Sequence, residues 1–205
     1  MEYKVGTTTV GLKFANGVVL AAESKATLGN LVADKEAKKI VQLDDRIAMT
    51  TAGSVGDAQQ LERILKAEIN LYKVLRNAEI TVNAVATLLA NILQSYRMFP
   101  YLTMLILGGV DKRGPQLCSV DPLGGISDGE KYIATGSGSP IAYGVMEDQF
   151  KEDLEKNEAI EIAIKAIKAA KERDAYSGGR RIDAMVIDEK GCEWVDKKLI
   201  EKLMK

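Results

Sequence analysis

The chain has 205 residues, of which 46% are apolar and 28% are charged, and these proportions are typical of one globular domain. Its 28 basic and 29 acidic residues leave a formal charge of -1, so the overall charge favours neither nucleic acid nor a membrane as a partner. No apolar run approaches the roughly 18 residues that a membrane-spanning helix needs, and the first residues do not resemble a signal peptide. We therefore expect a cytoplasmic protein, with Cys118 and Cys192 as free, buried thiols.

The first elements in chain order are predicted to be strands. Residues 7–14 place alternate side chains on opposite faces, and Asn16-Gly17 is a strong signal for a tight turn into the apolar run that starts at Val18. A second antiparallel pair is predicted over residues 39–43 and 46–51. The chain therefore opens with two predicted strand pairs.

Helices and strands alternate in the rest of the chain. Apolar residues recur at helical spacing over residues 55–75 and 81–96, and Thr81 is a suitable helix cap. The later elements are predicted as strands over 103–108, 116–120 and 131–135, helices over 141–147, 159–173 and 197–205, and two strands that flank a turn at 188–191. Because each face of a sheet must be buried, two layers of sheet with helices outside them is the economical architecture, and we expect one domain without repeats or linkers.

The chain contains no histidine. This absence excludes Ser-His-Asp and Cys-His catalysis, and it removes the commonest ligand of zinc, iron and copper. We therefore expect no metal and no cofactor. Any acid–base chemistry must use a carboxylate, a lysine, a tyrosine or a terminal amine.

A threonine-rich run, Gly6 to Gly11, lies near the start of the chain. It fails as a phosphate-binding loop, because that loop needs a lysine after its second glycine and this chain has Leu12. As a bare pattern, such a run is most often an edge strand. Cleavage between Gly6 and Thr7, however, would give Thr7 a free α-amine with a pKa of about 8, and a threonine with its own amine is a nucleophile–base pair that needs no histidine.

Five segments of the sequence, in order, resemble proteasome β-subunits of the archaeal type: GTTTVGLKFANGVVLAAESKATLGN, EAKKI, TTAGSVGDA, ATGSGSPIAYGVME and RDAYSGG. The resemblance implies the α+β fold of N-terminal-nucleophile hydrolases, a four-layer α-β-β-α sandwich of two antiparallel sheets flanked by helices. It also implies a leader over residues 1–6 and a single domain over residues 7–205. The related bacterial two-component peptidase matches GSGSP and RDAYSGG less well, and the N-terminal extension of proteasome α-subunits is missing.

The same resemblance implies the catalytic residues. It makes Thr7 the nucleophile and Lys39 the cation beside it, where a positive charge lowers the pKa of the hydroxyl. A buried lysine needs a carboxylate partner, and at the position where the family has this partner the chain has Glu23. The remaining residues that the resemblance implies are Gly53, whose N–H would bind the oxyanion, and the supporting residues Ser137, Asp174 and Ser177.

Glu23 departs from the family pattern, in which we expect aspartate. The extra methylene keeps the charge but is expected to shift the ion pair with Lys39 by about an ångström, and misplacements of that size can cost about a hundredfold in rate. We therefore expect one of two outcomes: either the site absorbs the extra methylene, or Glu23 marks a subunit that is processed slowly or scarcely cleaves.

The resemblance also implies where a substrate binds. Thr27 matches a residue that pairs with the substrate backbone as an added strand. The residues that match the first specificity pocket are Ala26, Ala37, Val41, Thr51 and Val55. Because these side chains are small or uncharged, we expect cleavage after apolar residues.

The function implied is that of a threonine endopeptidase that degrades unfolded proteins to peptides inside a compartment. The implied partners are proteasome α-subunits and other β-subunits in stacked heptameric rings, a regulatory ATPase that acts through the α-ring, and unfolded polypeptides. The alternative is a non-catalytic or weakly processed structural β-subunit of a mixed ring. A different amidohydrolase with an N-terminal nucleophile is a third possibility.

Overall fold

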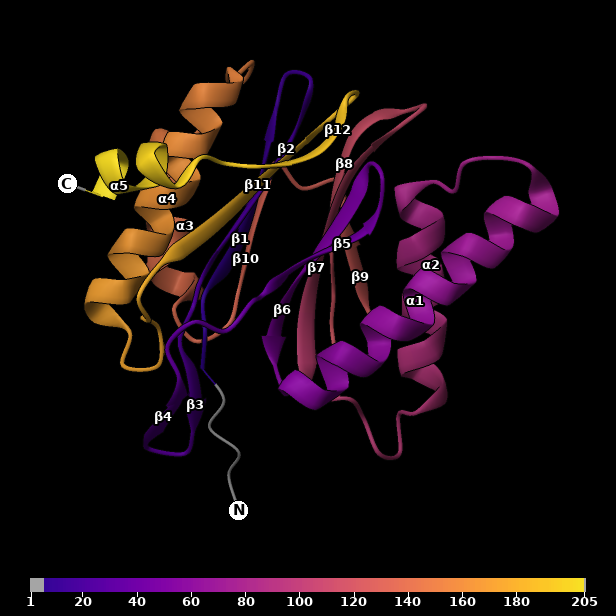
Figure 1. Cartoon of the computed structure of the whole chain (residues 1–205), viewed down its shortest axis with the longest axis horizontal. Helices are drawn as coiled ribbons and strands as arrows, with labels where there is room; N and C mark the ends of the chain where they lie inside the picture. The colour runs from indigo at the N-terminus through magenta and orange to yellow at the C-terminus, as the bar shows by residue number, and fades with distance from the viewer. Residues whose placement is uncertain (1–5, 205) are drawn as a thin grey trace.

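The computed structural model describes residues 6–204, which form four layers with two sheets in the middle (Figure 1). The first sheet has the strand order β10-β1-β2-β11-β12, and all its neighbouring pairs are antiparallel. Its strands are β1 Thr9–Phe14, β2 Gly17–Glu23, β10 Tyr132–Thr135, β11 Ile182–Asp188 and β12 Gly191–Trp194. Strand β1 is therefore an interior strand, and the edge-strand interpretation of the threonine-rich run is wrong.

The second sheet is also antiparallel and has the order β5-β6-β7-β8-β9. Its strands are β5 Ile40–Asp44, β6 Ile47–Gly53, β7 Thr103–Asp111, β8 Gly114–Val120 and β9 Ile126–Asp128. Strands β5 and β6 form the second predicted pair, joined by a short turn.

Helices cover the outer face of each sheet (Figure 1). The second sheet packs against α1 Val55–Arg76 and α2 Val82–Ser95, whose N-caps are Ser54 and Thr81. The first sheet packs against α3 Ser139–Gln149, α4 Lys156–Arg173 and α5 Lys197–Met204. The predicted four-layer α-β-β-α sandwich is therefore confirmed. No helix within residues 6–204 has both the length and the apolar character to span a bilayer.

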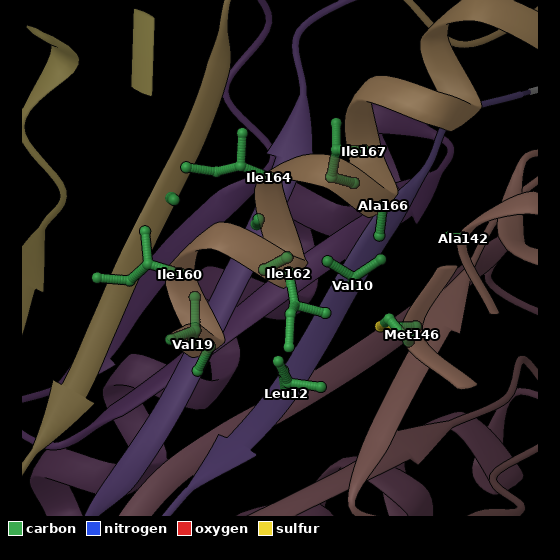
Figure 2. Packing of buried hydrophobic residues seen from close by; sticks show 14 of the residues in the cluster. Val10, Leu12, Val19, Ala142, Met146, Ile160, Ile162, Ile164, Ala166 and Ile167 are labelled. Atoms are coloured by element: carbon green, nitrogen blue, oxygen red, sulfur yellow. The ribbon is translucent and has the colours of Figure 1, made fainter. Parts of the chain in front are cut away.

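Both faces of strands β1 and β2 are buried, and their alternation separates two cores. On the helix side, Figure 2 shows Val10, Leu12 and Val19 packed beneath the isoleucines of α4. On the other side, alternate residues such as Val18 and Leu20 meet the second sheet. The cluster between the sheets contains Val18, Leu20, Ala22, Ile40, Ala48, Ile106, Leu117, Ile133, Met185 and Ile187.

Buried hydroxyls make a polar contact across the interface between the two sheets. The Thr9 hydroxyl lies 2.8 Å from the Thr50 hydroxyl of β6 and 2.8 Å from the Thr135 hydroxyl of β10. All three residues are buried, so the hydroxyls satisfy one another within an otherwise apolar interior.

The sequence did not predict the hairpin of β3 Ala26–Leu28 and β4 Leu31–Asp34, nor the short strand β9. All four residues of β4 are exposed, so this strand lacks the buried face that gives a strand its apolar alternation. Residues 1–5 of the expected leader and Lys205 of the expected tail helix lie outside the described residues.

Candidate active site

Thr7 lies just before β1 and is only 3% exposed. Its hydroxyl donates a hydrogen bond to Oε1 of Glu23 and accepts one from Nζ of Lys39. A hydroxyl held between an ammonium and a carboxylate is polarised and fixed in orientation, as a nucleophile requires. The structure thus brings together the three residues on which the predicted chemistry depends.

Lys39 is the inward-pointing member of the Lys38-Lys39 pair. It is 7% exposed, whereas Lys38 is exposed to solvent. Besides its contacts with Thr7 and Glu23, its ammonium donates to the Lys25 carbonyl oxygen at 2.6 Å. Burial lowers the pKa of Lys39, and the Glu23 carboxylate opposes that shift.

Glu23 ends strand β2 and is 1% exposed. Its Oε1 also accepts the backbone N–H of Thr8 at 3.3 Å, and its Oε2 accepts the N–H groups of Lys25 at 2.6 Å and Gly178 at 3.0 Å. With Thr7 and Lys39 included, five donors fix this carboxylate. Sequence reasoning missed the three backbone donors, because an amide contact leaves no mark on residue type.

Ser137, Asp174 and Ser177 form one network behind Thr7. Both serine hydroxyls donate to Oδ2 of Asp174 at 2.6 Å. Ser137 also lies 3.3 Å from the Thr7 carbonyl oxygen, and the Ser177 hydroxyl lies 2.6 Å from that of Thr8. Asp174 caps the C-terminus of α4, where the helix dipole disfavours an anion, so the two serines compensate an otherwise unfavourable charge.

Gly53 is the last residue of β6, and its position requires glycine. Its φ is +131°, and a Cβ there would lie 2.1 Å from the Leu102 carbonyl oxygen. The residue lines the cleft beside Thr7, immediately before the N-cap of α1. Glycine is therefore required here by the close approach of the neighbouring Leu102 backbone and by the positive φ.

The predicted substrate-binding residues line one cleft of about 680 Å³ together with three of the predicted catalytic residues, whereas Glu23, Ser137, Asp174 and Ser177 lie outside its lining. The predicted residues that line it are Thr7, Ala26, Thr27, Ala37, Lys39, Val41, Thr51, Gly53 and Val55. The cleft also contains charged residues that were not predicted to belong to the site, among them Asp34, Glu62 and Lys66. Glu62 and Lys66 form an ion pair of 2.7 Å on one face of α1, and their spacing of four residues was the signal available in the sequence.

Thr27 lies on β3, which pairs with β4 on one side only among the described residues. The Thr27 hydroxyl is buried and has no hydrogen-bond partner within the described part of the chain. An open strand edge with an unpaired hydroxyl next to it suits an extended peptide backbone.

The two cysteines cannot supply a competing nucleophile. Both are free, as expected, although Cys192 is only partly buried. Burial raises the pKa of the Cys118 and Cys192 thiols to about 12, so neither is a thiolate at neutral pH.

The four-layer sandwich, with a threonine, a lysine and a carboxylate gathered at the start of its first strand, is characteristic of hydrolases with an N-terminal nucleophile. The family described as "Proteasome subunit" matches residues 3–187. The chain belongs to this proteasome subunit family.

The names of the similar proteins specify the type of subunit. A protein of Ferroglobus placidus named "Proteasome subunit beta" is 56% identical over 185 residues, which cover 90% of this chain and 88% of the relative. Proteins of the same name from Methanoregula boonei and Methanocaldococcus vulcanius are each 50% identical to this chain, over 201 and 205 residues. These matches cover 94% and 92% of the two relatives. The resemblance to archaeal proteasome β-subunits is confirmed.

Proposed function

We propose that this chain is the threonine-type endopeptidase subunit of a proteasome core, with Thr7 as the nucleophile after residues 1–6 are removed. One observation carries the proposal: the buried Thr7 hydroxyl bonds to both Lys39 and Glu23 at the wall of the 680 Å³ cleft. Family membership implies assembly with other proteasome subunits in rings. Stacked heptameric rings with α-subunits, a regulatory ATPase and a cytoplasmic location are part of the proposal.

The first reaction is removal of the leader. The Thr7 hydroxyl oxygen attacks the Gly6 carbonyl carbon, an ester forms, the Gly6–Thr7 amide bond breaks, and the hydroxyl proton passes to the released nitrogen. Water then hydrolyses the ester, which gives a Gly6 carboxylate, restores the hydroxyl and leaves Thr7 with a free α-amine. Lys39 supports the attack, because its positive charge stabilises the developing alkoxide.

The second reaction repeats this chemistry on a peptide. The Thr7 amine, directly or through water, takes the hydroxyl proton while the oxygen attacks the scissile carbonyl. The Gly53 N–H stabilises the oxyanion, and the N-terminus of α1 adds a favourable dipole. The scissile C–N bond then breaks, the proton held by the Thr7 amine passes to the leaving nitrogen of the peptide, and water hydrolyses the remaining ester to release the other part of the peptide and restore the Thr7 hydroxyl.

The substrate is an extended polypeptide that adds a strand to the free edge of β3 at Thr27. Only an unfolded segment can present its backbone in this way. Ala26, Ala37 and Val41 favour an apolar residue before the scissile bond. The same cleft contains charged side chains, so the preference is not purely apolar.

The contacts of Glu23 support a catalytic role over the alternative of a structural subunit in a mixed ring. The carboxylate reaches Thr7 and Lys39 despite its extra methylene, and backbone amides hold it in place. The direct contacts among Glu23, Lys39 and Thr7 support the proposed roles of these three residues. Replacement of Glu23 by aspartate decides whether the extra methylene weakens the activity.

The test is the intact mass of the chain after assembly with a proteasome α-type subunit, together with hydrolysis of peptides. We expect loss of residues 1–6 and cleavage after apolar residues. Thr7→Ala is expected to retain the leader and to abolish hydrolysis, whereas Thr87→Ala, on the exposed surface of α2, is the matched control. A Thr7→Val chain that hydrolysed peptides as well as the wild type would refute the proposal, and a wild-type chain that kept its leader would favour the structural role.

A further inference from the structure

Gly6, the residue before the proposed nucleophile, is buried against a segment that lies far away in the sequence. A Cβ at this position would lie 1.9 Å from Cβ and 2.5 Å from Cγ of Tyr176, and 2.7 Å from the Ser137 hydroxyl oxygen. Side-chain carbons do not approach one another this closely without a shift of structure. The Ser137 hydroxyl can rotate away at the cost of its hydrogen bond to Asp174, whereas Cβ of Tyr176 is attached to the backbone and cannot rotate away.

The segment 174–179 that carries Tyr176 is tied to the active site. The Gly178 N–H donates to Glu23 at 3.0 Å, and the Lys25 ammonium donates to the Ala175 carbonyl oxygen at 2.8 Å. A shift of the segment that made room beside Gly6 would therefore pull on the carboxylate that orients the nucleophile. The space beside Gly6 is limited by the same contacts that organise the catalytic group.

We propose that Tyr176 determines the specificity of self-cleavage, because its Cβ leaves room for glycine alone at the position before Thr7. This inference rests on the proposed function and deepens it. Gly6 occupies this position without a side chain to clash, whereas a larger residue would have to shift its own backbone or move segment 174–179.

This limit applies to the leader and not to peptide substrates. The leader is covalently joined to Thr7, so Gly6 must lie where the chain places it, beneath Tyr176. A free peptide instead approaches along β3, and the side chain before its scissile bond faces the cleft wall of Ala26, Ala37 and Val41. The residue before the cleaved bond therefore contacts different groups in the two reactions: Tyr176 in self-cleavage, and the cleft wall in peptide cleavage.

The experiment measures the rate of leader removal by intact mass after assembly with an α-type subunit. Gly6→Ala is compared with the parent chain in three backgrounds: wild type, Tyr176→Ala and Tyr176→Gly. Only the last of these removes the Cβ that the added methyl would meet. Gly144→Ala, at an exposed helix position where a Cβ meets nothing within 4 Å, controls for an added methyl elsewhere.

We expect Gly6→Ala to slow leader removal by about tenfold or more in the wild-type and Tyr176→Ala backgrounds, and by less than about threefold in the Tyr176→Gly background. Three results would overturn the inference: an equal penalty in all backgrounds, no penalty in the wild type, or loss of all self-cleavage on Tyr176→Gly alone. A wild-type chain that retained its leader would instead refute the proposed function itself, so the two failures are distinguishable.

Discussion

Two lysine–glutamate pairs lie at the same cleft, and they differ most in how deeply their charges are buried. In the pair of Lys39 and Glu23 the side chains are 9% and 0% exposed, whereas in the pair of Lys66 and Glu62 they are 42% and 28% exposed. An exposed pair contributes about 0–1 kcal/mol, because water solvates both charges whether or not they touch. Removal of one partner from a buried pair costs about 3–5 kcal/mol, because the other charge is left without compensation. The buried pair is therefore the one that can act on a neighbouring hydroxyl.

The largest effect is expected from Lys39→Ala. This change leaves the Glu23 carboxylate buried without its cation and leaves the Thr7 hydroxyl without a positive neighbour, so we expect hydrolysis to fall by about a thousandfold and the leader to be retained. Rates of peptide hydrolysis and intact mass measure both effects. The adjacent exposed Lys38 gives the matched control, Lys38→Ala, which should stay within about threefold of the wild type. An equal loss of hydrolysis in the two variants would mean that the burial of Lys39 does not give it a special role.

A smaller effect is expected from Glu23→Asp. Shortening the side chain by one methylene draws the carboxylate away from Thr7 and Lys39, so we expect kcat/KM to fall by about tenfold to a hundredfold. Glu62→Asp makes the same change in the exposed pair and should have almost no effect. Faster hydrolysis by Glu23→Asp would mean that glutamate weakens this site, as the comparison with the family pattern predicts.

The smallest effect is expected from Lys66→Met. This change removes an exposed charge from the cleft wall, so we expect the free energy of unfolding to change by less than about 0.5 kcal/mol and hydrolysis of peptides with apolar residues by less than about threefold. Urea unfolding and a panel of peptides that differ in the charge before the scissile bond measure the two quantities. We expect the rate of hydrolysis to fall most for peptides with an acidic residue before the scissile bond. A loss as large as that of Lys39→Ala would mean that burial does not separate the two pairs.

The elements with a strong apolar period could be predicted from the sequence. Helix α1 was expected over residues 55–75 and is observed over Val55–Arg76, and the strands on either side of Asn16-Gly17 form the expected hairpin. The β3–β4 hairpin could not be predicted, because its exposed residues need no pattern. Helix α4 begins at Lys156, three residues before the expected start, and the capping box of Glu155 and Glu158 was the overlooked signal.

The candidate site was predicted by residue type but not by geometry. The resemblance named Thr7, Glu23 and Lys39, and the structure brings them into contact. The amide of Gly178 and the Cβ of Tyr176 were not foreseen, because they reach the site through folding over more than a hundred residues. Contacts that depend on backbone position have no signature in a single sequence.

The contact between the Thr9 and Thr50 hydroxyls has a mechanical consequence. Thr7 directly precedes β1 of the first sheet and Gly53 ends β6 of the second, so the gap between the proposed nucleophile and the proposed oxyanion donor spans the interface between two hydrogen-bonded sheets. Apolar packing alone resists separation of two surfaces better than it resists sliding, because it is not directional. The Thr9–Thr50 contact is directional, and it lies two residues from Thr7 and three from Gly53. It therefore opposes sliding of one sheet over the other at the place where a small slip would change the distance between Thr7 and Gly53.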